Sequence, residues 1–129
     1  MTYVTDTHPL RWYLAMDRRL GRRAELVFDD TENGEAIIVV PAIVLAETIR
    51  VVEKKRLLLE FQKVLRKIES SSNYRVLPLD LDVISALPRL VLLGELHDRI
   101  IVASANLLAA PLITADAAIT RSGYVETVW

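Results

Sequence analysis

Four acidic residues lie at the start, at the end or in the middle of apolar segments of the chain. Asp6 ends the opening run of residues 3–5, and Asp116 follows the apolar segment 111–114. Glu47 lies inside an apolar helical segment, and Asp98 opens another one. Acidic side chains rarely enter a core without a partner. Carboxylates gathered at one edge of a sheet would suit a magnesium ion, and such a site favours phosphodiester chemistry.

The elements that position these acids are predicted to be strands that alternate with helices. Apolar and β-branched runs predict strands at residues 2–5, 36–40, 74–77 and 112–114, with a last edge strand at 125–128. Helical spacing predicts a first helix capped by Thr7, a second that runs from Gly21 to Asp30, and others at 41–52, 55–70, 80–87, 98–109 and 116–121. The alternation predicts a three-layer α/β/α sandwich around a mostly parallel sheet of four to five strands, in one domain spanning residues 1–129.

The predicted topology would bring the four acids to one edge of the sheet. In open α/β sheets the ligand site lies beyond the carboxyl ends of the strands, which is where Asp6 and Asp116 stand. Simpler interpretations exist for each acid taken alone. Asp6, Asp98 and Asp116 are also suitable helix caps, and Glu47 is spaced for a helical ion pair with Arg50. Glu47 fits this interpretation least well, because its neighbours are apolar.

Composition excludes several other classes of site. The 129 residues contain no cysteine and two histidines, so a disulfide scaffold, a thiolate zinc site and a cysteine nucleophile are excluded. With a net charge of -1, the chain is not a general nucleic-acid coating protein. Its basic residues form clusters at 18–23 and 54–67, which are most simply solvated helix faces. No membrane-spanning run or signal segment is apparent, so we expect a cytoplasmic protein.

Motifs along the whole chain resemble those of the PIN-domain family. The opening run Tyr3-Val4-Thr5-Asp6-Thr7-His8, with Trp12, resembles the start of such a domain. Glu47 after Pro41-Ala42-Ile43-Val44-Leu45-Ala46 resembles the second acidic motif. The segments Glu95-Leu96-His97-Asp98-Arg99 and Leu112-Ile113-Thr114-Ala115-Asp116 resemble the third and fourth, and residues 125–129 resemble the family's ending. Four motifs in the right order make the resemblance specific, although Asp98 lacks the preceding proline and aromatic residue of many members.

The subgroup that the chain resembles is the VapC-type toxins of bacterial and archaeal toxin–antitoxin pairs. This resemblance implies an endoribonuclease dependent on Mg²⁺ or Mn²⁺, which cleaves RNA with an activated water, forms a homodimer and is inhibited by a small antitoxin. The acidic site would comprise Asp6, Glu47, Asp98 and Asp116. Thr114 and Glu95 would support it, and Arg99 with the Arg18–Arg23 cluster would contact phosphates. An apolar groove for a segment of the antitoxin would be formed by Trp12, Tyr13 and Met16, together with the second predicted helix and the helix at residues 55–70.

Three alternatives compete with this prediction. A haloacid-type phosphatase needs a second aspartate two residues after the first, but His8 stands there. A response-regulator receiver needs an acceptor aspartate after a central strand, where this chain has Pro41. A catalytically silent PIN-like domain that binds RNA or acts as a scaffold remains open, although four intact acids argue against it. His8 and His97 have no catalytic task in the family pattern, and we expect them to pack or face solvent.

Overall fold

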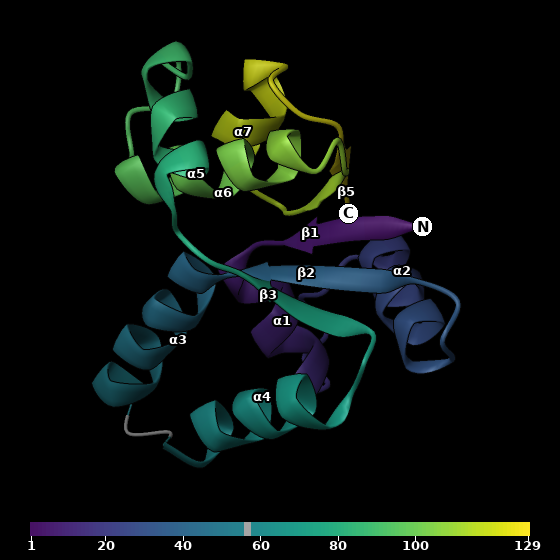
Figure 1. The fold of residues 1–129 in the computed structure, drawn as a ribbon. Helices are drawn as coiled ribbons and strands as arrows, with labels where there is room; N and C mark the ends of the chain where they lie inside the picture. Colours follow the sequence, from purple (N-terminus) through teal and green to yellow (C-terminus); the bar gives the residue numbers. More distant parts are fainter. Residues whose placement is uncertain (56–57) are drawn as a thin grey trace.

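The computed structural model describes residues 1–55 and 58–129 (Figure 1). Five parallel strands form one sheet in the order β3-β2-β1-β4-β5, with helices in the connections. The elements in chain order are β1 (Thr2–Thr5), α1 (Thr7–Leu14), α2 (Arg22–Glu32), β2 (Ile37–Pro41), α3 (Ala42–Lys55), α4 (Leu58–Ser70), β3 (Tyr74–Leu77), α5 (Leu81–Ala86), the 3-10 helix η1 (Leu87–Arg89), α6 (Leu96–Leu107), β4 (Leu112–Ile113), α7 (Ala117–Ser122) and β5 (Thr127–Val128).

The helices cover both faces of the sheet. Helices α1 to α4 lie on one side, and α5, α6 and α7 lie on the other (Figure 1). Strand residues such as Val4, Val40 and Leu112 are fully buried, because a covered parallel sheet excludes water from both faces. The run Ile100–Ala105 of α6 is buried in the same way. This architecture confirms the predicted three-layer sandwich, with a sheet that is wholly parallel.

Several predicted boundaries were wrong by a few residues. Thr7 is the first helical residue of α1, and Asp6 is its cap, because the Asp6 carboxylate accepts a hydrogen bond from the Thr7 N–H at 2.7 Å. Pro41 ends β2 and does not open the helix that follows. Helix α6 begins at Leu96, so Asp98 lies in its first turn and not at its cap.

Only part of the predicted helix at residues 55–70 can be compared with the structure. Lys55 belongs to α3, α4 begins at Leu58, and positions 56–57 lie outside the described residues. The predicted last strand is shorter than expected, with two residues in β5, and it is an edge strand as predicted. Within the two described ranges, no helix is both long enough and apolar enough to cross a membrane.

Candidate active site

A short chain of hydrogen bonds through Thr114 joins two of the predicted acids, Asp6 and Asp116, which lie far apart in the sequence. The Thr114 hydroxyl donates to Asp6 Oδ2 at 2.7 Å and accepts from the Asp116 N–H at 3.0 Å. Asp116 in turn caps α7, because its Oδ1 accepts from the Ile119 N–H at 3.0 Å. The register explains the meeting, since Thr5 pairs with Ile113 and the next residue on each strand is Asp6 or Thr114. Thr114 is 1% exposed, so these bonds are sheltered from water.

Asp98 reaches the same edge from the first turn of α6. Its side chain is 13% exposed, and burial raises the pKa of this carboxyl above its ordinary value. Nearby His97 opposes the rise, whereas the charges of Asp116, Asp6 and Glu95 add to it. The electrostatic influence of Asp6 and Asp116 on Asp98 indicates that three of the four predicted acids gather at one place. The helix N-terminus above them favours negative charge, which partly offsets their repulsion.

His97 bridges the remaining acid of this segment to Asp98. Its Nε2 lies 3.3 Å from Asp98 Oδ1, and its Nδ1 lies 3.8 Å from Glu95 Oε2. The Glu95 side chain is 73% exposed, so it stands at the rim of the acidic cluster. The sequence pattern assigned His97 no role, and its place between two acids follows from the first turn of α6, which the predicted helix omitted.

Glu47 and Arg99 relate to the cluster differently from the three aspartates. Glu47 is half-buried on α3, a helix that packs against α1 and α6. Within the described parts of the chain it makes no hydrogen bond and no ion pair with Arg50. Arg99 donates from Nε to the Leu93 carbonyl at 2.6 Å, so its guanidinium is partly held by the loop before α6. The roles predicted for Glu47 and Arg99 therefore stay predictions.

The donor set at this edge fits a hydrated divalent cation. Among the residues that the structure describes, no three acidic or histidine side chains are arranged to enclose a metal ion as they stand. Magnesium does not require such a cage, because it binds through one or two carboxylates and keeps several waters. The oxygens of Asp6, Asp98 and Asp116 are hard ligands of the right kind, and a cation would offset both the burial and the neighbouring negative charge that raise the pKa of Asp98.

Aromatic side chains form one wall of this edge. A cavity of roughly 210 Å³ lies among seven residues, which are Asp6, His8, Pro9, Trp12, Thr114, Ala115 and Asp116. The rings of His8 and Trp12 are stacked with centroids 5.3 Å apart, and Trp129 meets Trp12 edge-on at 5.9 Å. The sequence did not single out Trp129 as a site residue. The pairing of Ile113 with Val128 explains the position of Trp129, because the next residues after this pair are Thr114 and Trp129.

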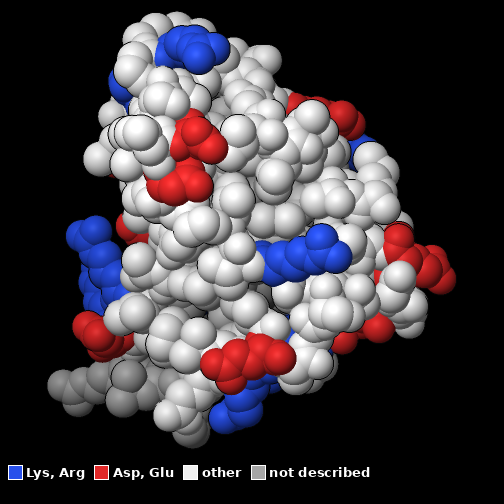
Figure 2. Space-filling model, in the orientation of Figure 1, with Lys and Arg blue, Asp and Glu red and all other residues white. Residues whose placement is uncertain are grey.

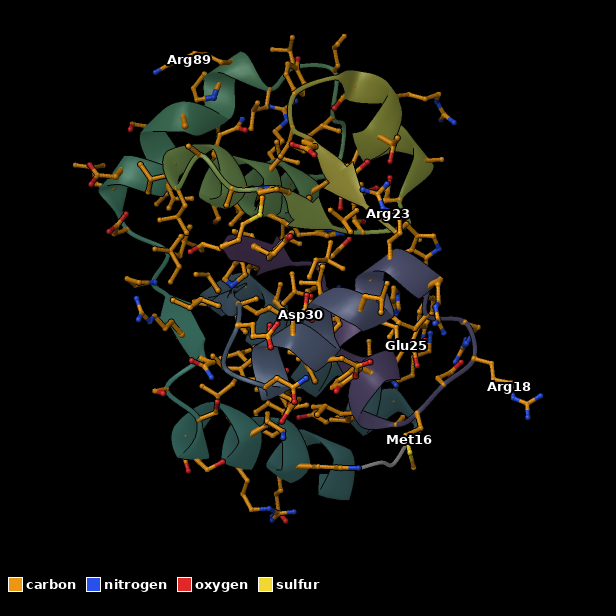
Figure 3. All side chains as sticks on the ribbon, turned by 90° about the vertical axis from the view of Figure 1, so that its right-hand side faces the viewer. Met16, Arg18, Arg23, Glu25, Asp30 and Arg89 are labelled. Carbon is orange, nitrogen blue, oxygen red and sulfur yellow. The ribbon has the colours of Figure 1, made fainter. Side chains whose placement is uncertain are left out.

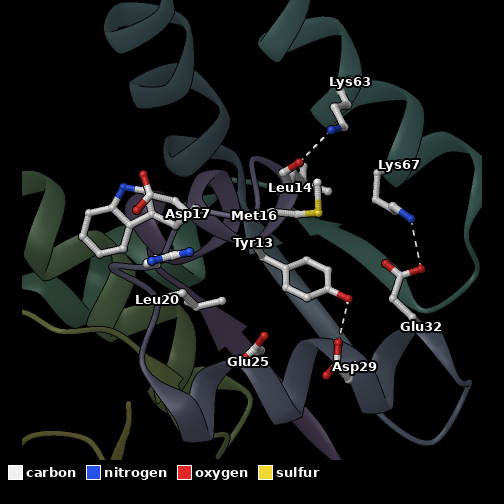
Figure 4. Close-up of a pocket in the computed structure, with 12 residues that line it drawn as sticks. Tyr13, Leu14, Met16, Asp17, Leu20, Glu25, Asp29, Glu32, Lys63 and Lys67 are labelled. Carbon is white, nitrogen blue, oxygen red and sulfur yellow. Dashed lines mark hydrogen bonds and ion pairs between the residues drawn. The ribbon is translucent and has the colours of Figure 1, made fainter.

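A larger hollow of roughly 750 Å³ lies between α1, α2 and α4, and we call it the groove (Figure 4). Trp12, Tyr13 and Met16 line it together with residues of α2 and α4, as the sequence predicted. Its lysines and several of its acids are already paired. Tyr13 donates to Asp29 at 3.0 Å, Lys67 contacts Glu32 at 3.0 Å, and Lys63 donates to the Leu14 carbonyl at 2.6 Å.

Comparisons with known proteins agree with this geometry. Solved structures that resemble the chain include VapBC2 from Rickettsia felis bound to a promoter DNA fragment, at 18% identity, TM-score 0.73 and coverage of 98% of this chain and 97% of that one. VapC20 from Mycobacterium tuberculosis, described as a sarcin-ricin loop cleaving toxin, has 15% identity, TM-score 0.72 and full coverage of both chains, 100% and 100%. FitAcB from Neisseria gonorrhoeae has 19% identity, TM-score 0.66 and coverage of 98% and 96%.

A search of curated protein sequences gave no significant match. At identities this low, the structural likeness establishes the fold and not the activity. The family comparison is more direct, because the model of the PIN domain matches residues 3–123. That span includes all four predicted acids, Thr114 and the three helices around the groove. The chain belongs to the PIN domain family.

Proposed function

We propose that residues 1–129 form one metal-dependent endoribonuclease domain, the toxin of a type II toxin–antitoxin pair acting on RNA in the cytoplasm. The observation that supports this proposal is the hydrogen-bonded link between Asp6 and Asp116 through Thr114 beyond the ends of β1 and β4, with Asp98 close enough for their charges to help raise its pKa. Like charges gathered at a strand edge cost stability, so they are best explained by a positively charged ligand. Support also comes from the family, and from structural neighbours described as a toxin–antitoxin complex and as a sarcin-ricin loop cleaving toxin.

Asp6, Asp98 and Asp116 would hold Mg²⁺ or Mn²⁺, with Glu47 completing the set and Glu95 at its rim. When bound, the cation would supply an activated water and neutralise charge on the reacting phosphate. The Thr114 hydroxyl fixes the orientation of the Asp6 carboxylate, and the Asp116 N–H fixes that hydroxyl. Burial of Thr114 keeps water from competing for these bonds, so the carboxylates are positioned before any ligand arrives.

The direct test is cleavage of a labelled RNA with Mg²⁺, with Mn²⁺ and with EDTA. Asp98→Asn should lower cleavage by at least about a thousandfold, since a metal site contributes several kcal/mol to the barrier. Asp30→Asn is the matched control, because Asp30 is exposed on α2 (Figure 3) and does not line the cavity at the acidic edge. Full metal-dependent activity in Asp98→Asn would overturn the proposal. Absence of both Mg²⁺ binding and cleavage in the unmodified chain would favour the silent RNA-binding or scaffold alternative.

The groove would receive a segment of the antitoxin. Because its own lysines are paired within the chain, an apolar segment of a partner would meet few unpaired charges there. Met16 stands at its rim with 89% of its surface exposed (Figure 3). The test is co-purification with the product of a neighbouring reading frame. Met16→Asp should reduce retention of that partner, whereas Leu26→Asp, at an exposed apolar position outside the groove, should not.

A second copy of this chain would cover an apolar face around α5, η1 and α6. Leu81, Val91, Leu92 and Leu96 are exposed to 78%, 67%, 71% and 63%, and large contiguous apolar patches mark interaction surfaces. Acidic side chains lie over α5, whereas the neighbouring surface over α6 is largely uncharged (Figure 2). Sedimentation should give a homodimer that Leu92→Glu dissociates and Leu26→Glu does not. A monomeric unmodified chain at micromolar concentration would contradict this assignment.

A further inference from the structure

A second cavity opens next to the acidic edge and has the opposite charge. It measures roughly 450 Å³ and lies between the start of α2, helix α7 and β5. Its lining comprises Arg23, Thr114, Ala115, Ala117, Thr120, Arg121, Thr127 and Trp129. Thr114 and Ala115 also line the acidic cavity, so the two hollows adjoin across these residues. We call the second one the arginine cavity.

The two arginines of this cavity have no acidic partner. Neither Arg23 nor Arg121 makes an ion pair or side-chain hydrogen bond within the described residues, and both are exposed. Arg23 lies at the boundary between α2 and the yellow C-terminal segment (Figure 3). The two guanidinium groups therefore come from separate elements and line one hollow.

Other members of the basic cluster at residues 18–23 are differently placed. Arg19 is held by Asp17, with Nη2 and Oδ2 2.7 Å apart, and its Cζ lies 4.7 Å from the centre of the Trp12 ring. Arg22 faces Glu25 at 4.0 Å. Arg18 projects away from the molecule (Figure 3). The cluster predicted to guide phosphates is thus divided, and only Arg23 lines the hollow beside the acids.

We propose that the arginine cavity binds a backbone phosphate of single-stranded RNA next to the phosphate held at the acidic edge. This inference rests on the proposed nuclease function and names the form of its substrate. Arginine binds phosphate with charge-assisted and often paired hydrogen bonds, and two free guanidinium groups at one hollow suit a single phosphodiester. A cluster of carboxylates repels RNA, and the adjoining positive charge offsets that repulsion on the approach.

Trp129 explains why single-stranded RNA fits best. Its indole lines the arginine cavity and touches Trp12, which lines the acidic cavity. Proteins that bind single strands combine a basic groove with aromatic side chains that contact the bases. The aromatic pair and the two arginines form such a combination beside the acidic edge, and Ala115 lines both hollows.

The test measures binding separately from cleavage. A fluorescein-labelled single-stranded RNA of oligouridine is titrated in EDTA, where no cleavage occurs, and anisotropy is followed over a range of salt. Arg23→Gln and Arg121→Gln should each weaken binding several-fold, and each should lower the slope of log Kd against log salt by about one. Arg89→Gln removes the same charge at a distant position on η1 and should change binding less than twofold (Figure 3).

Three results would overturn the inference. A double variant that combines Arg23→Gln with Arg121→Gln could bind the single-stranded RNA as tightly as Arg89→Gln does. In a parallel titration, the unmodified chain could bind duplex RNA more tightly than single-stranded RNA. Polyglutamate, a probe for acidic protein segments, could bind the unmodified chain but not the double variant, while RNA binds both equally. That result would assign the cavity to an acidic protein segment. The proposed nuclease function is judged apart from this, by cleavage in Mg²⁺. If the chain cleaves RNA and the arginine variants cleave with unchanged KM, the inference alone fails; if it binds through the arginines without cleaving, only the nuclease function fails.

Discussion

The groove and the acidic edge share the side chain of Trp12 but handle charge in opposite ways. In the groove, each lysine meets an oxygen of the chain itself, and Tyr13 donates to Asp29. At the acidic edge, Asp98 lies near other carboxylates that raise its pKa, and no lysine or arginine ion pair offsets their charge among the described residues. A surface whose charges are satisfied internally favours an apolar partner. A surface with charges of one sign requires a ligand of the other sign.

The groove depends on core packing, and Phe28→Ala is the change with the largest expected effect. Phe28 is fully buried and stacks on Tyr13 with ring centroids 4.7 Å apart. Its removal should lower the free energy of unfolding by about 3–5 kcal/mol, measured by urea denaturation. Because such a loss threatens folding, Phe28→Leu serves as the milder variant. In Phe28→Leu, partner binding in the groove should weaken while RNA cleavage per folded molecule stays unchanged; an equal loss of both would break the comparison.

The junction between the two regions is tested by Gly21→Ala. A Cβ at this position would lie 2.7 Å from the Trp129 carbonyl carbon and 2.8 Å from its ring, so backbone must move. We expect a loss of about 1–3 kcal/mol in unfolding free energy, as in other overpacked sites. Since Trp129 touches Trp12, RNA binding should weaken as well. Gly94→Ala is the control, because a Cβ there meets nothing within 4 Å.

Hydrogen bonding at the acidic edge is tested by Thr114→Val. The substitution keeps the shape but removes the donor to Asp6 and the acceptor of the Asp116 N–H. A buried group left without its partner costs about 1–3 kcal/mol, so unfolding in urea should begin at lower concentration. Cleavage should fall much further than groove binding, which should not change. Thr31→Val is the matched control, because it removes a buried hydroxyl that donates to the Val27 carbonyl on α2, and it should leave cleavage per folded molecule within a factor of two.

The sequence predicted the layers and the main acids because strand ends are marked locally. The apolar runs at residues 2–5 and 111–114 are each followed closely by an aspartate, so Asp6 and Asp116 could be assigned to one edge without knowing any distance. Thr114 was placed beside Asp116 by adjacency, but its bond to Asp6 depends on the pairing of β1 with β4. Local patterns do not fix that register. The same limit applied to Trp129, whose position follows from a strand of two residues.

Helix boundaries were predicted less well where two polar residues competed for one role. Asp6 and Thr7 are both good caps, and the structure selects Asp6, whose other oxygen accepts from Thr114. Around Asp98, the helix starts two residues earlier than the pattern indicated, which brings His97 between Glu95 and Asp98. Glu47 shows the opposite relation between sequence and structure. An acid inside an apolar helix is easy to notice in the sequence, but Glu47 makes no polar contact with other described residues.

The smallest expected effect is a gain in stability from Asp98→Asn. The pKa of Asp98 is raised in the folded state, first by burial and then by Asp116, Asp6 and Glu95. The folded chain therefore binds this proton more tightly than the unfolded chain, and stability is lost as pH rises from 3.8 through the folded pKa. At neutral pH without metal, Asp98→Asn should melt at a higher temperature than the unmodified chain, and the difference should shrink below pH 3.8. Saturating Mg²⁺ should reverse the order, because only the unmodified chain retains the full set of ligands. Asp30→Asn should show neither behaviour, so a gain of equal size in that control would mean that general charge, and not the acidic edge, sets the effect.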